Sequence, residues 1–125
     1  PTVGYFLMFR RIVALRQRGW RLMQRFFELY DHRLQKLGFG LVTPRECEAT
    51  GSHVSLTHPD AWQITQDLIL QHRVIPDFRG PDIIRFGITP LYTLGREIDQ
   101  AVAALESSVT HGTYRSYPQQ RRGVT

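Results

Sequence analysis

The sequence predicts an α+β domain in which a small, mostly antiparallel sheet carries helices on one face. Apolar residues recur every three or four positions in three stretches, which is the period of a helix. Short stretches between them alternate apolar and polar residues or carry several β-branched residues, as strands do. The predicted order is helix, two strands, helix, two strands, helix, and such runs are typical of this class.

The composition is that of one globular domain. The chain has 125 residues, of which 42% are hydrophobic, and a single cysteine, Cys47, so it has no intrachain disulfide. No apolar run approaches the roughly 20 residues of a membrane-spanning helix. The net charge is +5, and residues 1–36 carry most of the positive charge. Such an imbalance can mark a nucleic-acid-binding surface. The favoured interpretation is that these arginines form the solvent-exposed side of one helix.

The first predicted helix covers residues 10–36, and Gly38 stops it. Arginines occupy most of its other sides. Its apolar stripe consists of Ile12, Leu15, Gly19, Leu22, Met23, Phe26, Tyr30, Leu34 and Leu37.

The first two predicted strands follow that glycine. Residues 38–45 form a short strand that Pro44 ends. Residues 51–58 alternate, so Val54 and Leu56 point to one face of the sheet. The polar residues on the opposite face are His53, Ser55 and Thr57.

A second helix is predicted over residues 59–72, with Pro59 in its first turn. Residues 73–78 form a strand that Pro76 confines to an edge of the sheet or to an irregular position. The apolar stripe of the helix consists of Ala61, Ile64, Leu68 and Ile69.

The fourth predicted strand covers residues 82–88, and a third helix begins at Thr93. From Thr110 the chain is polar and is predicted to be an extended tail. Ile84, Phe86 and Ile88 share one face of the strand, while Ile83, Arg85 and Gly87 share the other. The apolar side of the third helix consists of Leu94, Ile98, Ala101, Val102, Leu105 and Val109.

Arg85 is the unusual residue of this strand. Burying a guanidinium without an anion is costly, because the charge loses its water and gains no partner. If the helices cover the other face, Arg85 points to the open face of the sheet. Its anion is then either an internal acid, such as Asp77 or Asp82, or a ligand. The residues alone favour the internal ion pair.

The stretch "RVIPDFRGPDIIRFGITPLY" at 73–92 resembles the C-terminal domain of kynureninases, pyridoxal-phosphate enzymes of the aspartate-aminotransferase fold. The flanking "LVTPRE" at 41–46 and "GSHVSLTHPDA" at 51–61 agree with it. The resemblance divides the chain into a small domain at 12–109 and a C-terminal tail at 110–125. Residues 1–11 are then the junction with a large domain that this chain lacks.

This resemblance implies a hydrolase of tryptophan catabolism and NAD biosynthesis that cleaves L-kynurenine, or its 3-hydroxy form, to anthranilate and L-alanine. Arg85 would bind the α-carboxylate of the substrate, and Tyr92 is a secondary candidate for the site. Pyridoxal phosphate would belong to the large domain, because Lys36 is the one lysine here and no cofactor motif surrounds it. The chain alone is therefore expected to be inactive. A homodimer in the cytoplasm is also implied.

The residues alone leave two other functions open. A cysteine desulfurase or an aminotransferase of the same fold also has a carboxylate-binding arginine in its small domain, although the Pro-Leu-Tyr segment favours a kynureninase. A stand-alone RNA-binding module would use the basic first helix, which lacks the interleaved exposed aromatic residues of such surfaces. The five histidines have no zinc-site spacing, so no metal is expected.

Overall fold

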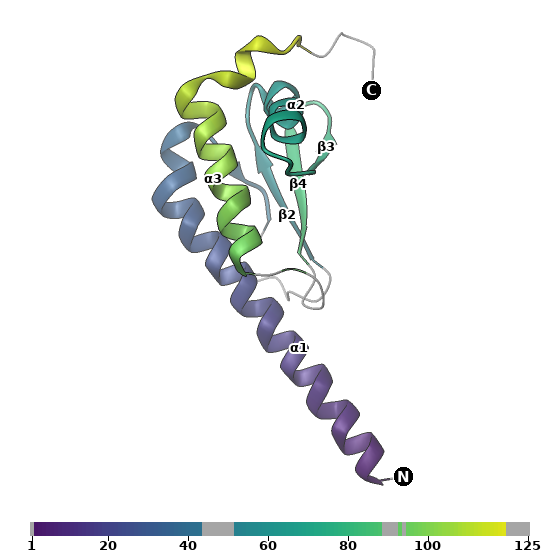
Figure 1. Ribbon diagram of the computed structural model, residues 1–125. Helices are drawn as coiled ribbons and strands as arrows, with labels where there is room; N and C mark the ends of the chain where they lie inside the picture. The colour runs from purple at the N-terminus through teal and green to yellow at the C-terminus, as the bar shows by residue number, and fades with distance from the viewer. Residues whose placement is uncertain (1, 44–51, 89–92, 94, 120–125) are drawn as a thin grey trace.

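The computed structural model describes residues 2–43, 52–88, 93 and 95–119. The chain begins with one long helix, which a π-helical turn and a 3-10 turn extend (Figure 1). Two further helices, four strands and another 3-10 turn follow. The elements are α1 (Thr2–Leu29), a π-helical turn (Tyr30–Leu34), a 3-10 turn (Gln35–Leu37), β1 (Gly40–Leu41), β2 (Ser52–Thr57), α2 (Ala61–Gln71), β3 (Asp77–Arg79), β4 (Ile83–Ile88), α3 (Gly95–His111) and a last 3-10 turn (Thr113–Ser116).

The four strands form one antiparallel sheet in the order β1-β2-β4-β3. β2 and β4 are its long central strands, and their register places Ser55 opposite Arg85. β3 is an edge strand, as Pro76 predicts, but it is shorter than expected and begins after that proline. β1 is likewise shorter than predicted, with two residues of the strand expected over 38–45. Pro44 lies outside the described residues.

One face of the sheet forms the hydrophobic core. Val54, Leu56 and Ile84 on this face are 0% exposed. α1 and α3 lie side by side along one side of the sheet (Figure 1), and the buried residues of all three helices join the same core. The predicted α+β class, with a core on one face and a polar face opposite, is confirmed. The fully buried helical side chains are Met23, Leu34, Ile64, Leu68, Val102 and Leu105, among others.

The first helix differs from its predicted limits. It already begins at Thr2, changes to a π-helical turn at Tyr30 and ends at Gly38, whose φ of 94° confirms the predicted glycine stop. Its N-terminal half projects beyond the rest of the molecule (Figure 1). Ile12, placed on the predicted apolar stripe, is 47% exposed there. Other large apolar side chains that are exposed among the described ones of this half are Leu7, Met8, Phe9 and Val13.

The second helix begins two residues later than predicted, and Pro59 lies in the turn before it. The predicted apolar stripe is confirmed at three positions that are 0% exposed, namely Ala61, Ile64 and Leu68. Ile69, predicted on the apolar stripe, is 36% exposed, whereas Asp67 is 0% exposed. Both Ser108 and Thr113 donate hydrogen bonds of 2.6 Å to Oδ2 of Asp67. The buried carboxylate therefore joins α2 to α3 and to the turn that follows α3.

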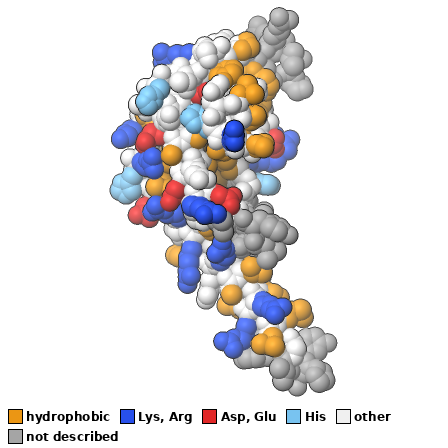
Figure 2. All heavy atoms as spheres, in the orientation of Figure 1, with side chains coloured by type: hydrophobic (Ala, Val, Ile, Leu, Met, Phe, Trp, Pro, Cys, Tyr) orange, Lys and Arg blue, Asp and Glu red, His pale blue; other side chains and the backbone are white. Residues whose placement is uncertain are grey.

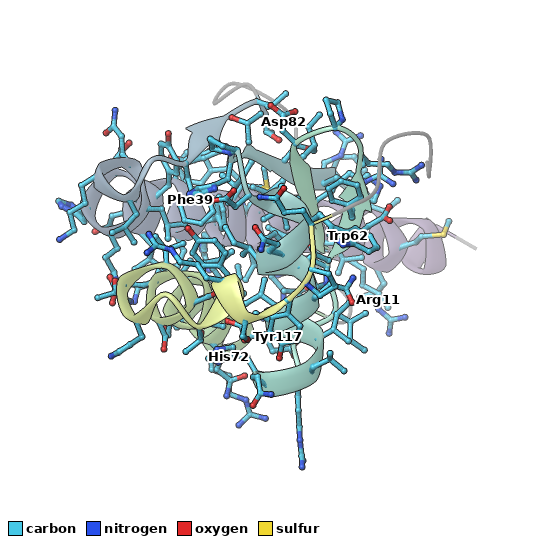
Figure 3. The ribbon with its side chains drawn as sticks, turned by 90° about the horizontal axis from the view of Figure 1, so that it is seen from above. Arg11, Phe39, Trp62, His72, Asp82 and Tyr117 are labelled. Atoms are coloured by element: carbon cyan, nitrogen blue, oxygen red, sulfur yellow. The ribbon has the colours of Figure 1, made fainter. Side chains whose placement is uncertain are left out.

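The chain after Thr110 is not extended, so this prediction is wrong for residues 110–116. α3 continues to His111, a 3-10 turn follows, and Tyr114 is 4% exposed. The Tyr114 hydroxyl donates a hydrogen bond of 3.0 Å to Asp60. Tyr117 lies beside α2 (Figure 3), where its backbone oxygen accepts a hydrogen bond from Gln63. These residues belong to the folded body, because an aromatic anchor in the core fixes them.

An ion pair at the end of the first helix offers a test of the packing between this end and α3. Arg33 donates two hydrogen bonds of 3.0 Å to the two oxygens of Glu106, and this interaction lowers the pKa of Glu106 below its usual 4.5. An acid with a lowered pKa in the folded state stabilises the fold above its unfolded pKa, and the benefit disappears as the pH falls through the folded value.

We therefore expect Glu106→Gln to lower the free energy of unfolding by about 0.5–1 kcal/mol at pH 7. The difference from the wild type should narrow as the pH falls below 4.5, the unperturbed value. Urea unfolding at several pH values measures both effects. A difference that stays constant down to strongly acidic pH would contradict the ionic origin of the contribution.

Candidate functional site

Arg85 lies in the middle of β4, on the face of the sheet opposite the core. Its neighbour Ile84 is 0% exposed on the core face, whereas the Arg85 side chain is 28% exposed. The predicted orientation is confirmed. Strand alternation is the cause, since a strand that buries Ile84 and Ile88 against helices must turn Arg85 the other way.

The guanidinium contacts an internal acid as well as open space. Nη2 of Arg85 donates a hydrogen bond of 2.8 Å to Oδ2 of Asp77 on β3. Arg79 donates a second hydrogen bond of 3.0 Å to the same oxygen. Asp77 is thus the internal partner that the residues suggested. No ion pair joins Asp82 to Arg85 in the described part of the chain.

Most of the hydrogen-bonding capacity of Arg85 is unused by the described residues. A guanidinium has several N–H donors arranged in a planar fork. The bond to Asp77 takes one of them, and Nε is buried without a partner among the residues that the structure describes. Because Nε is buried, the remaining donors on Nη1 and Nη2 are the ones that an incoming anion would contact.

A cleft of about 320 Å³ opens beside the guanidinium. Gly87 faces His53 across the β2–β4 register, and a Cβ at Gly87 would lie 3.7 Å from Nδ1 of His53. The missing side chain leaves space in the cleft next to Arg85. The lining residues are His53, Ile75, Pro76, Asp77, Arg85 and Gly87.

The charges around the cleft favour a small anion. Arg85 and Arg79 supply two cations, and Asp77 supplies one anion that contacts both. A carboxylate matches the planar fork of a guanidinium, because two parallel N–H donors can meet its two oxygens. This part of the sheet can therefore bind and orient a carboxylate.

The histidines do not form a metal site with other residues that the structure describes. His53 is exposed at the cleft, while His58 is 7% exposed and packs against the ring of Phe39. Burial lowers the pKa of His58, which is consistent with a neutral ring whose Nδ1 accepts a hydrogen bond from the backbone of Asp60. Among the described residues, no group of His, Cys, Asp and Glu is suited to hold a metal ion. None of the described helices has the length and apolar character required to cross a bilayer.

The residues of this chain do not fit a pyridoxal-phosphate site. The cofactor needs a lysine for its Schiff base, and Lys36 is exposed in the 3-10 turn after α1 and does not line the cleft. Tyr92, the secondary candidate for the site, lies outside the described residues. Within the described part of the chain, the cleft is lined by a guanidinium of a kind that suits a carboxylate, but by no residue that would hold this cofactor.

Arg85 and Asp77 were predictable from the sequence, whereas Arg79 and the shape of the cleft were not. One signal was available, because Asp77 and Arg85 lie at equal distances in sequence on either side of Pro81 and a tight hairpin there pairs them. The side of the cleft that Ile75 and Pro76 form was not detectable, since these residues precede β3 in an irregular segment.

Comparisons with known proteins identify the family of this chain. The family model described as "Kynureninase C-terminal domain" matches residues 15–105. Kynureninase of Pseudomonas fluorescens is 40% identical over 115 residues, covering 91% of this chain and 27% of the relative. Kynureninase of Geobacillus thermodenitrificans is 31% identical over 126 residues, covering 99% of this chain and 29% of the relative. The chain thus spans less than a third of the length of these relatives.

A solved structure is also similar. A mutant of M. tuberculosis Rv3290c superposes with a TM-score of 0.55 and 30% sequence identity, covering 78% of this chain and 21% of the solved one. The fold is that of the C-terminal small domain of a pyridoxal-phosphate-dependent transferase-like enzyme. The chain belongs to the kynureninase C-terminal domain family.

Proposed function

We propose that this domain supplies the carboxylate clamp of a kynureninase-like, pyridoxal-phosphate-dependent hydrolase that cleaves L-kynurenine to anthranilate and L-alanine. The observation that carries the proposal is the position of Arg85. Its guanidinium lies on the open face of the sheet beside a cleft of about 320 Å³, with donors that the described residues do not use. This reaction belongs to tryptophan catabolism and to the supply of NAD precursors.

The contribution of Arg85 to such a reaction is binding and orientation. Two parallel, charge-assisted hydrogen bonds fix the plane of the α-carboxylate as well as adding affinity. A substrate held at this end has fewer orientations relative to the reacting bond, and correct orientation can lower a barrier by several kcal/mol. The role is specific to arginine, because the ammonium group of a lysine is a point charge that lacks the planar fork of N–H donors.

The cofactor and its lysine would come from a large domain of the same enzyme, which makes this chain inactive alone. The projecting half of α1 is the surface we assign to that domain. It carries exposed apolar side chains such as Leu7, Met8 and Phe9, and Figure 2 shows hydrophobic side chains interspersed with basic ones along it. A homodimer in the cytoplasm, acting on L-kynurenine or its 3-hydroxy form, completes the proposal.

Two other functions compete with this one. A cysteine desulfurase or an aminotransferase of the same fold would use a similar arginine, but the relatives from Pseudomonas fluorescens and Geobacillus thermodenitrificans, which align with 91% and 99% of this chain, are kynureninases. An RNA-binding module would use the basic side of α1. We treat that side as solvated surface, where Arg25 pairs with Asp99; Arg33, in the π-helical turn that follows α1, pairs with Glu106.

The test is an assay of the full-length protein that carries this domain. Supplied with pyridoxal phosphate and L-kynurenine, it should release anthranilate, which its fluorescence reports continuously. L-Cysteine offered in place of L-kynurenine should yield no sulfide. Sulfide release, or transamination of L-kynurenine without anthranilate, would contradict the proposal and favour the related enzymes of this fold.

A further inference from the structure

We infer that Asp77 is a positioning residue for Arg85, which holds the guanidinium in the orientation that receives the substrate carboxylate. The inference rests on the proposed function and adds a second residue to its site. Asp77 does not need to touch the substrate for this role. It acts through the single hydrogen bond of 2.8 Å that joins it to Nη2 of Arg85.

The sheet register builds this contact. Asp77 is the Cα partner of Arg85 in the β3–β4 ladder, so the two side chains leave the sheet next to each other on the same face. β3 is an edge strand, and the Asp77 side chain is 52% exposed. The acid therefore lies at the mouth of the cleft, where it can hold a guanidinium without burying it.

Arg85 depends on this contact for its orientation. An arginine side chain has several rotatable bonds, and its head is ordered only where a partner fixes it. Among the described residues, Asp77 provides the one hydrogen bond to Arg85, and the buried Nε has no partner. Without Asp77 the guanidinium would sample several rotamers, and binding a carboxylate would have to order it.

Arg79 explains why an acid beside the clamp does not repel the substrate. Its Nε donates a hydrogen bond of 3.0 Å to the same Oδ2 that Arg85 contacts. This second cation keeps Asp77 in place and offsets its charge. The three side chains together carry a net positive charge beside the cleft, so an incoming carboxylate meets attraction.

Two other roles for Asp77 make different predictions. If Asp77 merely occupied Arg85 until a substrate displaced it, its removal would tighten substrate binding. If Asp77 merely stabilised the fold, its removal would affect ligands with and without a carboxylate equally. The positioning role predicts weaker binding that is confined to ligands with a carboxylate.

The experiment uses the full-length enzyme and two probes, L-kynurenine and kynuramine, which is the same molecule without the α-carboxylate. Asp77→Ala should lower kcat/KM for L-kynurenine about 5- to 30-fold, the effect of a lost charge-assisted hydrogen bond. Asp77→Asn should lower it less, since an amide oxygen still accepts a weaker hydrogen bond. The inhibition constant of kynuramine should stay unchanged in both variants.

A double-mutant cycle and a matched control complete the design. In an Arg85→Ala background, Asp77→Ala should have no further effect, because a residue that acts through Arg85 has nothing left to position. Asp82→Asn removes the same charge close to the start of β4 without a contact to Arg85, and it should behave like the wild type.

Each remaining outcome overturns the inference. A lower KM in Asp77→Ala would show that Asp77 competes with the substrate for Arg85. An equal loss of binding for L-kynurenine and kynuramine would show that Asp77 only stabilises the fold. An Asp77→Ala variant indistinguishable from Asp82→Asn, in an enzyme that Arg85→Ala impairs, would overturn the inference alone. An Arg85→Ala variant with unchanged kcat/KM would overturn the proposed function as well, so the two failures are distinguishable.

Discussion

Arg85→Ala is expected to reduce kcat/KM for L-kynurenine by about 30-fold to several thousand-fold in the full-length enzyme. This range corresponds to about 2–5 kcal/mol, the usual cost of removing one partner of a charged, hydrogen-bonded pair at a binding site. The substrate carboxylate would lose its cation and also its orientation. Asp77 would keep the hydrogen bond from Arg79, which offsets its charge.

Steady-state kinetics with two companion variants measure this effect. Arg85→Lys keeps the charge but not the fork, so it should recover only part of the loss. Arg96→Ala removes an exposed arginine at the start of α3 and should leave kcat/KM unchanged. Equal activities of Arg85→Ala and Arg96→Ala would refute the clamp.

Asp67→Ala is expected to lower the free energy of unfolding by about 2–4 kcal/mol, which follows from the loss of two hydrogen bonds to a buried charged group. Ser108 is 0% exposed, and its hydroxyl would lose the partner it has in the structure. Thr113 would lose the contact that joins the last 3-10 turn to α2. The buried Tyr114 follows directly, so the end of the described chain should loosen first.

Urea unfolding measures the size of this effect, and hydrogen exchange at residues 112–117 locates it. Asp99→Ala is a suitable control, because this acid forms an ion pair with Arg25 in which both side chains are nearly half exposed. The control should change stability little. An Asp67→Ala variant as stable as the control would contradict a structural role for the buried carboxylate.

The sequence predicted the helices and the two faces of the sheet, because both follow from short-range periodicity. It did not predict where α1 begins. Periodicity identifies an apolar stripe through Ile12, but it does not tell whether another part of the same chain covers that stripe. In the structure this part of α1 projects from the body, and Ile12 is 47% exposed.

Asp67 shows a second limit of prediction from sequence. From the sequence, a carboxylate in an amphipathic helix is normally predicted on the solvent-exposed side, since burial of an unpartnered charge is costly. Its partners Ser108 and Thr113 lie 41 and 46 residues further along the chain. No local pattern joins residues so far apart, and the same limit applies to Tyr114, whose hydroxyl reaches Asp60.

The candidate site was more accessible to prediction. The alternation of β4 placed Arg85 on the open face, and this orientation is confirmed. The two possible anions, Asp77 and a ligand, looked like alternatives in the sequence. In the structure Arg85 contacts Asp77 and also borders an open cleft, so the internal partner and a ligand are compatible.

The most direct test is a crystal structure of the full-length enzyme with an unreactive amino-acid analogue of L-kynurenine. We predict that both oxygens of its α-carboxylate lie about 2.7–2.9 Å from nitrogens of Arg85, the range of charge-assisted hydrogen bonds. Asp77 should still contact the same guanidinium. A carboxylate bound by another side chain, with Arg85 paired to Asp77 alone, would contradict the role proposed for this domain.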